Sequence, residues 1–387
     1  MSKNQKIIAG IVVLIIVIGG VWYVKHKPKS ATKQININPQ ASTGPANTGP
    51  VSPISGVSCD NWNRRPVAVM QPADVSARPA AGFSQADMVF EMPVFTNSNT
   101  RLMGVYVCNL PDEIGSIRSA RHDYLPLAKS LDAIYVHWGY SKFAQTLLSQ
   151  KILDNIDCLT TDYCARWPET GKMKLEDTGH ITSAKIQEAT QKYGYHTDDK
   201  FAGYPHQDEI AVDQRPATGK LRVAYPKPYD VTYQYNKANN SWDRIWAGVQ
   251  DTDKNNGQKV SPKNVVVMFA EDSQIKLADE QSYKDKGLLD PWSLVPQDEQ
   301  AGLDYGGVGR YNNLQIGDPW FDTQDSGQAK FYLNGKEFTG TWKKDKSKLD
   351  SKLFFLDDSG QEIKFVPGEI WVDVVEPDMG VTWNPQG

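Results

Sequence analysis

The run MVFEMPVF at Met88–Phe95 carries the main signal of the fold, because β-branched and aromatic side chains dominate it and turn-forming residues bound it. Such runs are typical of β-strands. Three similar runs surround it in the sequence, at Pro66–Met70 (PVAVM), Leu102–Cys108 (LMGVYVC) and Ala133–Trp138 (AIYVHW). Together the four runs predict the strands of a first folded domain.

Helices are expected between and after these strands. Apolar residues recur at helical spacing over Arg118–Leu131, and Pro126 predicts that this helix starts, bends or restarts there. Ser183–Gly194 is a clearer helix, with Ser183 as its N-cap and Gly194 as its C-terminal stop. Strands that alternate with helices favour a mixed α/β domain over residues 61–204.

After residue 204 the pattern changes to short strand-like runs separated by turns. Asn334-Gly335 is a hairpin signal, since both residues accept a positive φ. We therefore expect a β-rich second domain over residues 205–387, and an α+β fold for the folded part as a whole. The expected strands are Leu221–Ala224, Val231–Tyr235, Asn264–Phe269, Ala329–Leu333, Leu353–Leu356 and Ile370–Val375.

The uncharged segment Ile7–Val24 predicts a membrane anchor. At ~1.5 Å of rise per helical residue it spans about 27 Å, close to the ~30 Å hydrocarbon core of a bilayer. A cleaved signal peptide is the alternative, but no small-x-small cleavage pattern follows Gly20. A lipoprotein signal would need a cysteine directly after the apolar run, whereas the first cysteine is Cys59. Residues 1–25 are thus expected to form a head and a single transmembrane helix.

Residues 26–60 follow as a linker rich in Pro, Gly, Ser, Thr and Asn, which is typical of a flexible tether. Basic residues flank the anchor on both sides, so charge alone does not decide its orientation. The net charge of −4 excludes an electrostatic attraction to nucleic acid. Aromatic residues make up 10% of the chain, which suits a saccharide-binding surface but more often reflects core packing.

The four cysteines favour disulfides over a metal site, since no CxxC or nearby HxxxH occurs. Cys158 and Cys164 flank a short loop that they could close, which leaves Cys59 to Cys108. The sequence permits three connectivities, and four free thiols are the alternative. We expect no metal and no cofactor.

Three arginines form the first group of site candidates, namely Arg101 and the pair Arg118 and Arg121 in IGSIRSAR. If the segment is helical, the pair shares one helix face and can hold a carboxylate or phosphate bidentately. Ser119 adds a hydroxyl, and a helix N-terminus there would also favour an anion. The alternative is structural ion pairing with carboxylates such as Asp132, Glu91 or Asp87.

Two histidines form the second group. His137 ends a predicted buried strand, where it could act as acid or base, or simply be packed and hydrogen-bonded. His180 in DTGHITS could form a catalytic pair with a serine. No GxSxG, HExxH, P-loop or GxGxxG motif occurs in a suitable context, and the glycines of residues 306–309 do not supply one.

Five segments together resemble a known family: RPVAVM, ARPAAGFSQADMVFE, TR at Thr100-Arg101, IGSIRSAR and LDAIYVHWG, read in this order from Arg65 to Gly139. They are similar to the YerB-like lipoprotein family of bacteria, a domain of unknown function (3048) with a companion C-terminal domain. NVVVMF at Asn264–Phe269 and the run Leu353–Val375 resemble the companion. The resemblance implies an extracytoplasmic, membrane-tethered, two-domain protein, and implies no reaction.

This chain also departs from the family pattern. A transmembrane anchor stands where a lipid-modified cysteine is typical, Asp74 replaces an asparagine-rich or histidine-bearing turn, and His180 lies in TGHITS in place of a Pro-His-Asn run. The transfer of a role is therefore safest for Arg118, Ser119 and Arg121, followed by Arg101 and His137.

Two functions remain open at this point. In the first, the chain is a cell-envelope binding module that holds an anionic group of a wall polymer, peptide or envelope protein with its arginines. In the second, it is an envelope hydrolase or transferase with His137 or His180 as acid/base. Both place the N-terminus in the cytoplasm, the anchor Ile7–Val24 in the cell membrane and the folded part outside.

Overall fold

The structure, a computed structural model, describes residues 50–94, 99–169, 171, 173–274, 280–288, 312–314, 316–320 and 324–387. The predicted anchor at Ile7–Val24, the linker before residue 50 and the glycines of 306–309 lie outside these ranges. Within them, no helix is long and apolar enough to cross a membrane. The described residues form a mixed α+β fold in which strands dominate, as expected.

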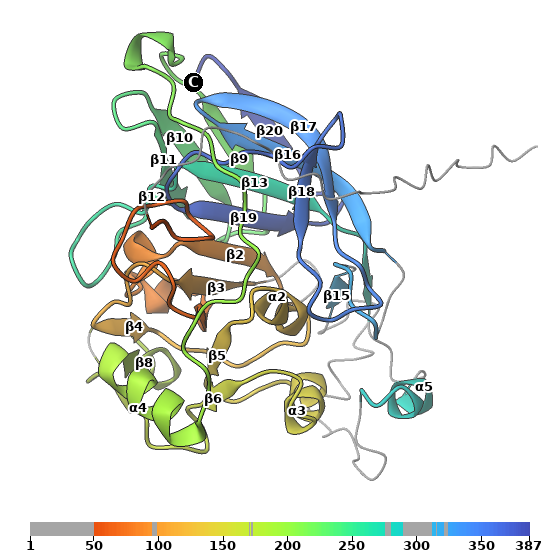
Figure 1. Ribbon diagram of the computed structural model, residues 1–387. Helices are drawn as coiled ribbons and strands as arrows, with labels where there is room; N and C mark the ends of the chain where they lie inside the picture. The colour runs from red at the N-terminus through yellow and green to blue at the C-terminus, as the bar shows by residue number, and fades with distance from the viewer. Residues whose placement is uncertain are drawn as a thin grey trace, which may run out of the picture. The chain divides into compact units, whose positions relative to one another are not determined.

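A ten-stranded sheet is the main feature of the fold (Figure 1). Its two halves come from different parts of the chain, since five neighbouring strands precede residue 204 and the other five follow it. In order across the sheet the strands are β18 (Phe354–Asp357), β17 (Lys336–Lys343), β16 (Ser326–Leu333), β13 (Asn264–Phe269), β19 (Ile370–Val375), β2 (Met88–Pro93), β3 (Thr100–Tyr106), β1 (Val67–Pro72), β5 (Ile134–His137) and β6 (Asn155–Asp157).

The two halves join where β19 pairs with β2 in parallel, with Ile370 opposite Met88 and Asp373 opposite Glu91. On its other side β19 pairs in parallel with β13, and β2 pairs with β3 in antiparallel orientation. The predicted division into domains at residue 204 stays a prediction, and the strands on its two sides share this sheet.

Three smaller sheets complete the described strands. The largest of them has five strands and is built entirely from residues after 204. Its strands, in order, are β12 (Val249–Gln250), β11 (Ser241–Trp246), β10 (Val231–Asn236), β9 (Lys220–Val223) and β20 (Val381–Asn384). The others are β4 (Glu113–Gly115), β8 (Gly179–Thr182) and β7 (Cys164–Arg166), and the pair β14 (Asp272–Gln274) and β15 (Asn312–Leu314).

Both faces of the central sheet are buried, which explains why its inner strands read as continuous apolar runs. Side chains alternate between two cores, since Ala68 and Met70 pack on one face and Val67 and Val69 on the other. The first core includes residues of α2 (Tyr124–Ser130) and α3 (Lys142–Ser149). The second includes residues of the five-stranded sheet and of α4 (Ser183–Tyr193).

The helices agree with the sequence in type and differ in their ends. Helix α2 begins at Tyr124, so that Pro126 falls in the first turn, where its missing N–H is not needed. Helix α4 is capped by Thr182, whose hydroxyl accepts from the Lys185 N–H, one residue before the predicted cap. Gly194 ends α4 in the left-handed conformation, as predicted. The remaining helices are α5 (Glu280–Asp285) and four short 3-10 turns at Val75–Ala77, Phe83–Gln85, Leu175–Asp177 and Val212–Gln214.

The strands predicted from apolar runs are confirmed, and so is the hairpin at Asn334-Gly335, where both residues have positive φ between β16 and β17. Strands β11 and β17 were not predicted. Their burial is interrupted by exposed or half-exposed positions, because polar residues interleave with apolar ones in them. Short apolar runs therefore found every strand of the ten-stranded sheet except β6 and β17, and two strands of the five-stranded sheet, β9 and β10.

Candidate functional site

The segment that carries Arg118 and Arg121 is extended rather than helical. It leaves β4 at Gly115, and its backbone bonds to three different strands or strand ends: Ile117 N–H to Gly179 O at 2.8 Å, Arg118 N–H to Met70 O at 2.8 Å, and Trp138 N–H to Arg118 O at 3.0 Å. These bonds occupy the groups that a helix would use, so α2 starts only at Tyr124. The expected helix face for the two arginines, and a helix N-terminus beside Arg118, are therefore wrong.

Arg118 forms a buried ion pair. Its Nη2 lies 2.5 Å from Asp177 Oδ1 and 3.6 Å from Asp74 Oδ2. Asp177 is fully buried and also accepts from Ser76 Oγ at 2.5 Å. The partners differ from the expected Asp132, Glu91 and Asp87 because Asp177 reaches the site from a 3-10 turn 59 residues later.

Arg101, on β3, is buried without a carboxylate within salt-bridge distance in the described part of the chain. It is 6% exposed, and its Nε and Nη1 have no hydrogen-bond partner there. Burial first, and then repulsion from Arg121 and Arg118, lower the pKa of Arg101 to about 9, while Asp74 acts in the opposite direction. The guanidinium therefore stays charged at neutral pH, with the N–H groups of Nε and Nη1 unused.

Arg121 is half-buried, and its Nη1 donates to Ala120 O at 2.9 Å. The structure thus brings Arg101, Arg118 and Arg121 together around Asp74, and we call these four residues the arginine cluster. The fourth predicted ligand residue, Ser119, lies in the same segment but donates its hydroxyl to Trp138 O at 3.1 Å.

A residue from beyond residue 204 also reaches the arginine cluster. Tyr229 Oη, between β9 and β10, donates to Asp74 Oδ1 at 3.3 Å. Burial and the Asp74 carboxylate raise the pKa of Tyr229 to about 12, so the phenol is neutral and can donate. Tyr124 donates to Arg101 O at 2.5 Å, and burial raises the pKa of Tyr124 well above its usual value. Two neutral phenols therefore flank three cations and one carboxylate.

Comparison with known proteins identifies the family. Residues 54–196 match the family described as "Protein of unknown function (DUF3048) N-terminal domain", and residues 221–289 and 309–372 match its C-terminal domain. The chain belongs to the DUF3048 family.

YerB of Bacillus subtilis (strain 168), whose name marks it as a proposed lipoprotein, is 24% identical to this chain over 335 residues, which are 85% of this chain and 86% of YerB. The crystal structure of the YerB protein from Bacillus subtilis has the same fold, with a TM-score of 0.67 and 22% identity. The match covers 86% of this chain and 99% of that structure. These similarities establish the DUF3048 fold. The function has to be inferred from the geometry of the site.

The two candidate histidines of this DUF3048 chain are packed against neighbours. His137 is 1% exposed, its Nδ1 donates to Gly139 O at 2.8 Å, and its Nε2 lies 3.2 Å from Asn155 Oδ1. The ring of His180 stacks on Trp167 with centroids 4.5 Å apart. Burial lowers the pKa of both histidines, which favours neutral rings. A catalytic role for either stays a prediction.

Both predicted disulfides are confirmed. Cys59 bonds to Cys108, and Cys158 bonds to Cys164. The first ties the segment before β1 to the end of β3, and the second closes the loop between β6 and β7. Neither bond touches the arginine cluster.

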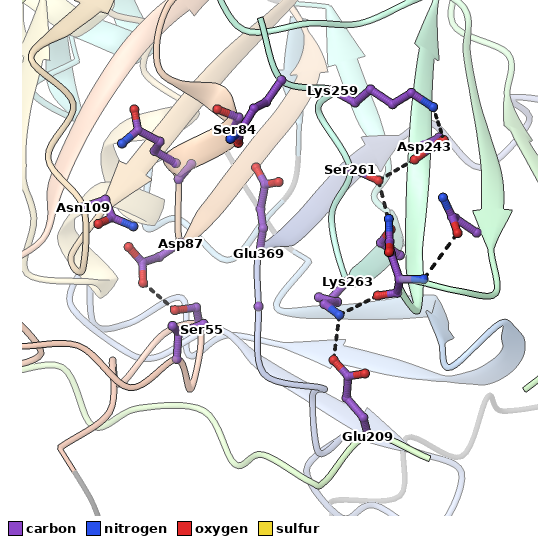
Figure 2. A pocket seen from close by; sticks show the side chains of 18 of the residues that line it. Ser55, Ser84, Asp87, Asn109, Glu209, Asp243, Lys259, Ser261, Lys263 and Glu369 are labelled. Carbon is purple, nitrogen blue, oxygen red and sulfur yellow. Dashed lines mark hydrogen bonds and ion pairs between the residues drawn. The ribbon is translucent and has the colours of Figure 1, made fainter. Parts of the chain in front are cut away.

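Sequence reasoning missed a polar pocket of about 870 Å³ (Figure 2). It lies between residues of both family domains, with Ser55, Asp87 and Asn109 on one wall and Asp243 and Ser261 on the other. Single serines, asparagines and carboxylates are common on any surface, so no local signal in the sequence marks them.

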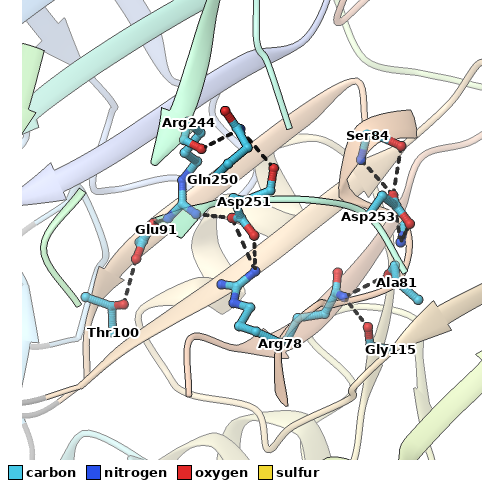
Figure 3. A network of polar contacts seen from close by, with 12 residues as sticks. Arg78, Ala81, Ser84, Glu91, Thr100, Gly115, Arg244, Gln250, Asp251 and Asp253 are labelled. Atoms are coloured by element: carbon cyan, nitrogen blue, oxygen red, sulfur yellow. Dashed lines mark hydrogen bonds and ion pairs between the residues drawn. The ribbon is translucent and has the colours of Figure 1, made fainter. Parts of the chain in front are cut away.

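Sequence reasoning also missed a buried ionic network (Figure 3). Arg244 Nη2 lies 2.5 Å from Glu91 Oε2, and its Nη1 bonds to Asp251. Arg78 Nη1 lies 3.4 Å from Asp251, and Thr100 Oγ1 donates to Glu91 Oε1 at 2.7 Å. The network joins β2 to β11 across 153 residues of sequence, a separation that no motif spacing reveals.

Proposed function

We propose that this chain is a membrane-tethered, extracytoplasmic binding protein of the bacterial cell envelope, which holds an anionic group of an envelope polymer, peptide or partner protein at the arginine cluster. Three things support the location: the apolar run Ile7–Val24, the two disulfides of the folded part, and the lipoprotein name of YerB. Disulfides persist in oxidising compartments outside the cytoplasm.

The observation that carries the binding role is Arg101. A buried guanidinium whose Nε and Nη1 lack partners among the described residues costs folding free energy, and its nearest charges include two more arginines. An anion placed among these cations would accept the unused N–H groups and offset their mutual repulsion. Asp74 supplies part of this compensation and is shared with Arg118 and Tyr229.

The direct test is a titration of the full-length protein in detergent with inorganic phosphate, pyrophosphate and citrate, followed by calorimetry. We expect at least one of these anions to bind. We expect Arg101→Met to weaken the binding by tenfold or more, since a charge-assisted hydrogen bond contributes about 1.5–3 kcal/mol.

Arg222→Met is the matched control, because Arg222 lies on β9 with a side chain 43% exposed and a loose contact of 3.6 Å to Asp230. The control should keep the wild-type affinity within about twofold, as expected for an exposed charge. Equal affinity in Arg101→Met and the wild type, or no binding of any of the three anions, would contradict the proposal.

A further inference from the structure

The polar pocket differs from the arginine cluster in its walls and in its charges. Its volume of about 870 Å³ is sufficient for a ligand of one or two sugar units or a short peptide. Hydroxyl and amide side chains from Ser84, Asn109, Asn236 and Ser261 line it, together with apolar side chains such as Val212. Such a lining offers a ligand hydrogen bonds as well as apolar contact.

Most of the charges in the pocket already have partners. Lys259 Nζ lies 2.6 Å from Asp243, and Lys263 Nζ lies 2.6 Å from Glu209. Asp87 accepts from Ser55 Oγ at 2.5 Å and from the Val107 N–H at 2.7 Å. These pairs hold the walls together and leave little net charge for a ligand to neutralise.

Glu369 is the exception to this pairing. It stands between the two walls in Figure 2, directly before β19. Its backbone carbonyl accepts from the N–H groups of Lys263 and Asn264 at 3.1 and 3.2 Å, which fixes the position of the residue. Its carboxyl atom Oε1 is buried and has no hydrogen-bond partner among the described residues.

The charges that face Glu369 are mostly negative. Asp253, Asp87 and Asp251 repel its anionic form, and Arg244 attracts it. Burial is the largest influence, and together with the three carboxylates it raises the pKa of Glu369 well above its usual value. Asp253 differs from Glu369 because it accepts the N–H groups of Gly82 and Ser84. Hydrogen bonds thus stabilise the Asp253 carboxylate, whereas Oε1 of Glu369 has none within the described residues.

We propose that this pocket is a second binding site, for a hydroxyl-rich ligand that carries a protonated amine, and that the amine forms an ion pair with Glu369. The ammonium group would replace the proton as the neutralising charge and donate to Oε1. The ligand hydroxyls would bond to the serine and asparagine side chains of the walls. No group of three metal-ligating side chains occurs in the described ranges, so a divalent cation fits the site less well.

This inference is independent of the proposed anion site, since the two sites share no residue and select opposite charges. The binding reaction has a signature of its own. Because burial raises the pKa of Glu369 and the ion pair needs its ionised form, binding at a pH below that pKa should release a proton. As pH rises towards the raised pKa of Glu369, less of this proton has to be removed, and the apparent affinity for an ammonium ligand should increase.

The test uses full-length protein in detergent, titrated calorimetrically with glucosamine, glucose and lysine amide. Glucosamine should bind about tenfold more tightly than glucose, the effect of one charge-assisted hydrogen bond. Titration at pH 6 in two buffers of different ionisation enthalpy should show proton release with glucosamine. Binding of lysine amide with no binding of glucosamine would contradict a hydroxyl-rich ligand.

The variant Glu369→Gln should lose both the preference for the amine and the proton release. Glu188→Gln, an exposed change of the same kind on α4, should keep both. Thermal unfolding tests whether Glu369→Gln folds. Removal of a desolvated carboxyl should leave the melting temperature equal or higher. Equal binding of glucose and glucosamine, an unaltered preference in Glu369→Gln, or no binding of any amine would overturn the proposal.

Discussion

Two neighbouring residues of β3 contact two different arginine systems. Thr100 bonds to Glu91 and so belongs to the buried network of Arg244, whereas Arg101 belongs to the arginine cluster. Their side chains leave opposite faces of the strand, as those of Leu102 and Met103 do when they enter separate cores. Arg244 has two carboxylate partners and Arg101 has none within the described residues.

The difference teaches that burial of an arginine does not by itself indicate its role. The guanidinium carbon of Arg244 also lies 4.3 Å from the centroid of the Trp371 ring, so the folded chain itself surrounds this arginine with partners. Arg101 is similarly buried, but its environment supplies like charges in place of partners. The first arrangement connects two sheets, and the second leaves hydrogen-bonding capacity for a ligand.

Replacement of Arg244 should give the largest effect. Arg244→Met leaves Glu91 buried without a cation and leaves Asp251 with Arg78 alone, and we expect the free energy of unfolding to fall by about 3–5 kcal/mol. Urea denaturation measures it. Lys185→Met, which breaks the exposed pair with Glu188, should cause no measurable change. A loss below about 1 kcal/mol for Arg244→Met would show that the network contributes little.

A bound anion should have the next largest effect on the stability of the protein. At a concentration 100 times the dissociation constant, a ligand stabilises the protein by about 2.7 kcal/mol. Phosphate or whichever probe anion binds should therefore raise the melting temperature of the wild type and of Arg244→Met. It should raise that of Arg101→Met less, since tenfold weaker binding at the same concentration leaves about 1.4 kcal/mol. The same rise in the last variant would place the anion elsewhere.

Replacement of Arg101 by methionine should change the free energy of unfolding in the opposite direction from replacement of Arg244. Arg101→Met removes an unpartnered buried charge and its repulsion from Arg118 and Arg121, so stability at pH 7 should stay equal or rise by roughly 1 kcal/mol. Urea denaturation of both methionine variants side by side measures the contrast. A loss comparable to that of Arg244→Met would remove the distinction between the two regions.

The smallest expected effect concerns Tyr229. Tyr229→Phe deletes the hydrogen bond to Asp74 and frees this carboxylate to compete with an anion for the arginines. Anion affinity should fall by roughly two- to fivefold, and stability by about 1 kcal/mol or less. Tyr193→Phe on α4, a partly exposed position, is the control for the loss of a phenol. Unchanged affinity in Tyr229→Phe would limit the site to the residues before 204.

Much of the fold could be predicted because its signals are local. The apolar runs of β2 and β19, the Asn334-Gly335 turn and the stop at Gly194 each reflect a preference of a few adjacent residues. The parallel pairing of β2 with β19 could not be predicted, since nothing in Met88–Pro93 specifies a partner almost 300 residues away.

The residues of the site also divide into those that the sequence predicted and those that it could not. Arg101, Arg118 and Arg121 were recognised as residue types suited to an anion, and the structure brings them together. Their helical setting was wrong because apolar spacing over Arg118–Leu131 does not reveal that the backbone bonds elsewhere. Asp177 and Tyr229 could not be anticipated, since each approaches from a distant segment. The state of Glu369 depends on burial, which the sequence does not show.

The pairing of β19 with β2 also constrains how the protein is made. Strand β2 is complete once residue 93 has been synthesised, yet one of its edges has no partner until the ribosome has added Ile370–Val375. For most of synthesis, the first half of the chain exposes an apolar strand edge of the kind that promotes aggregation. A chain that ends before residue 370 lacks this partner altogether. Premature termination near the C-terminus would therefore disturb the part of the fold that is synthesised first.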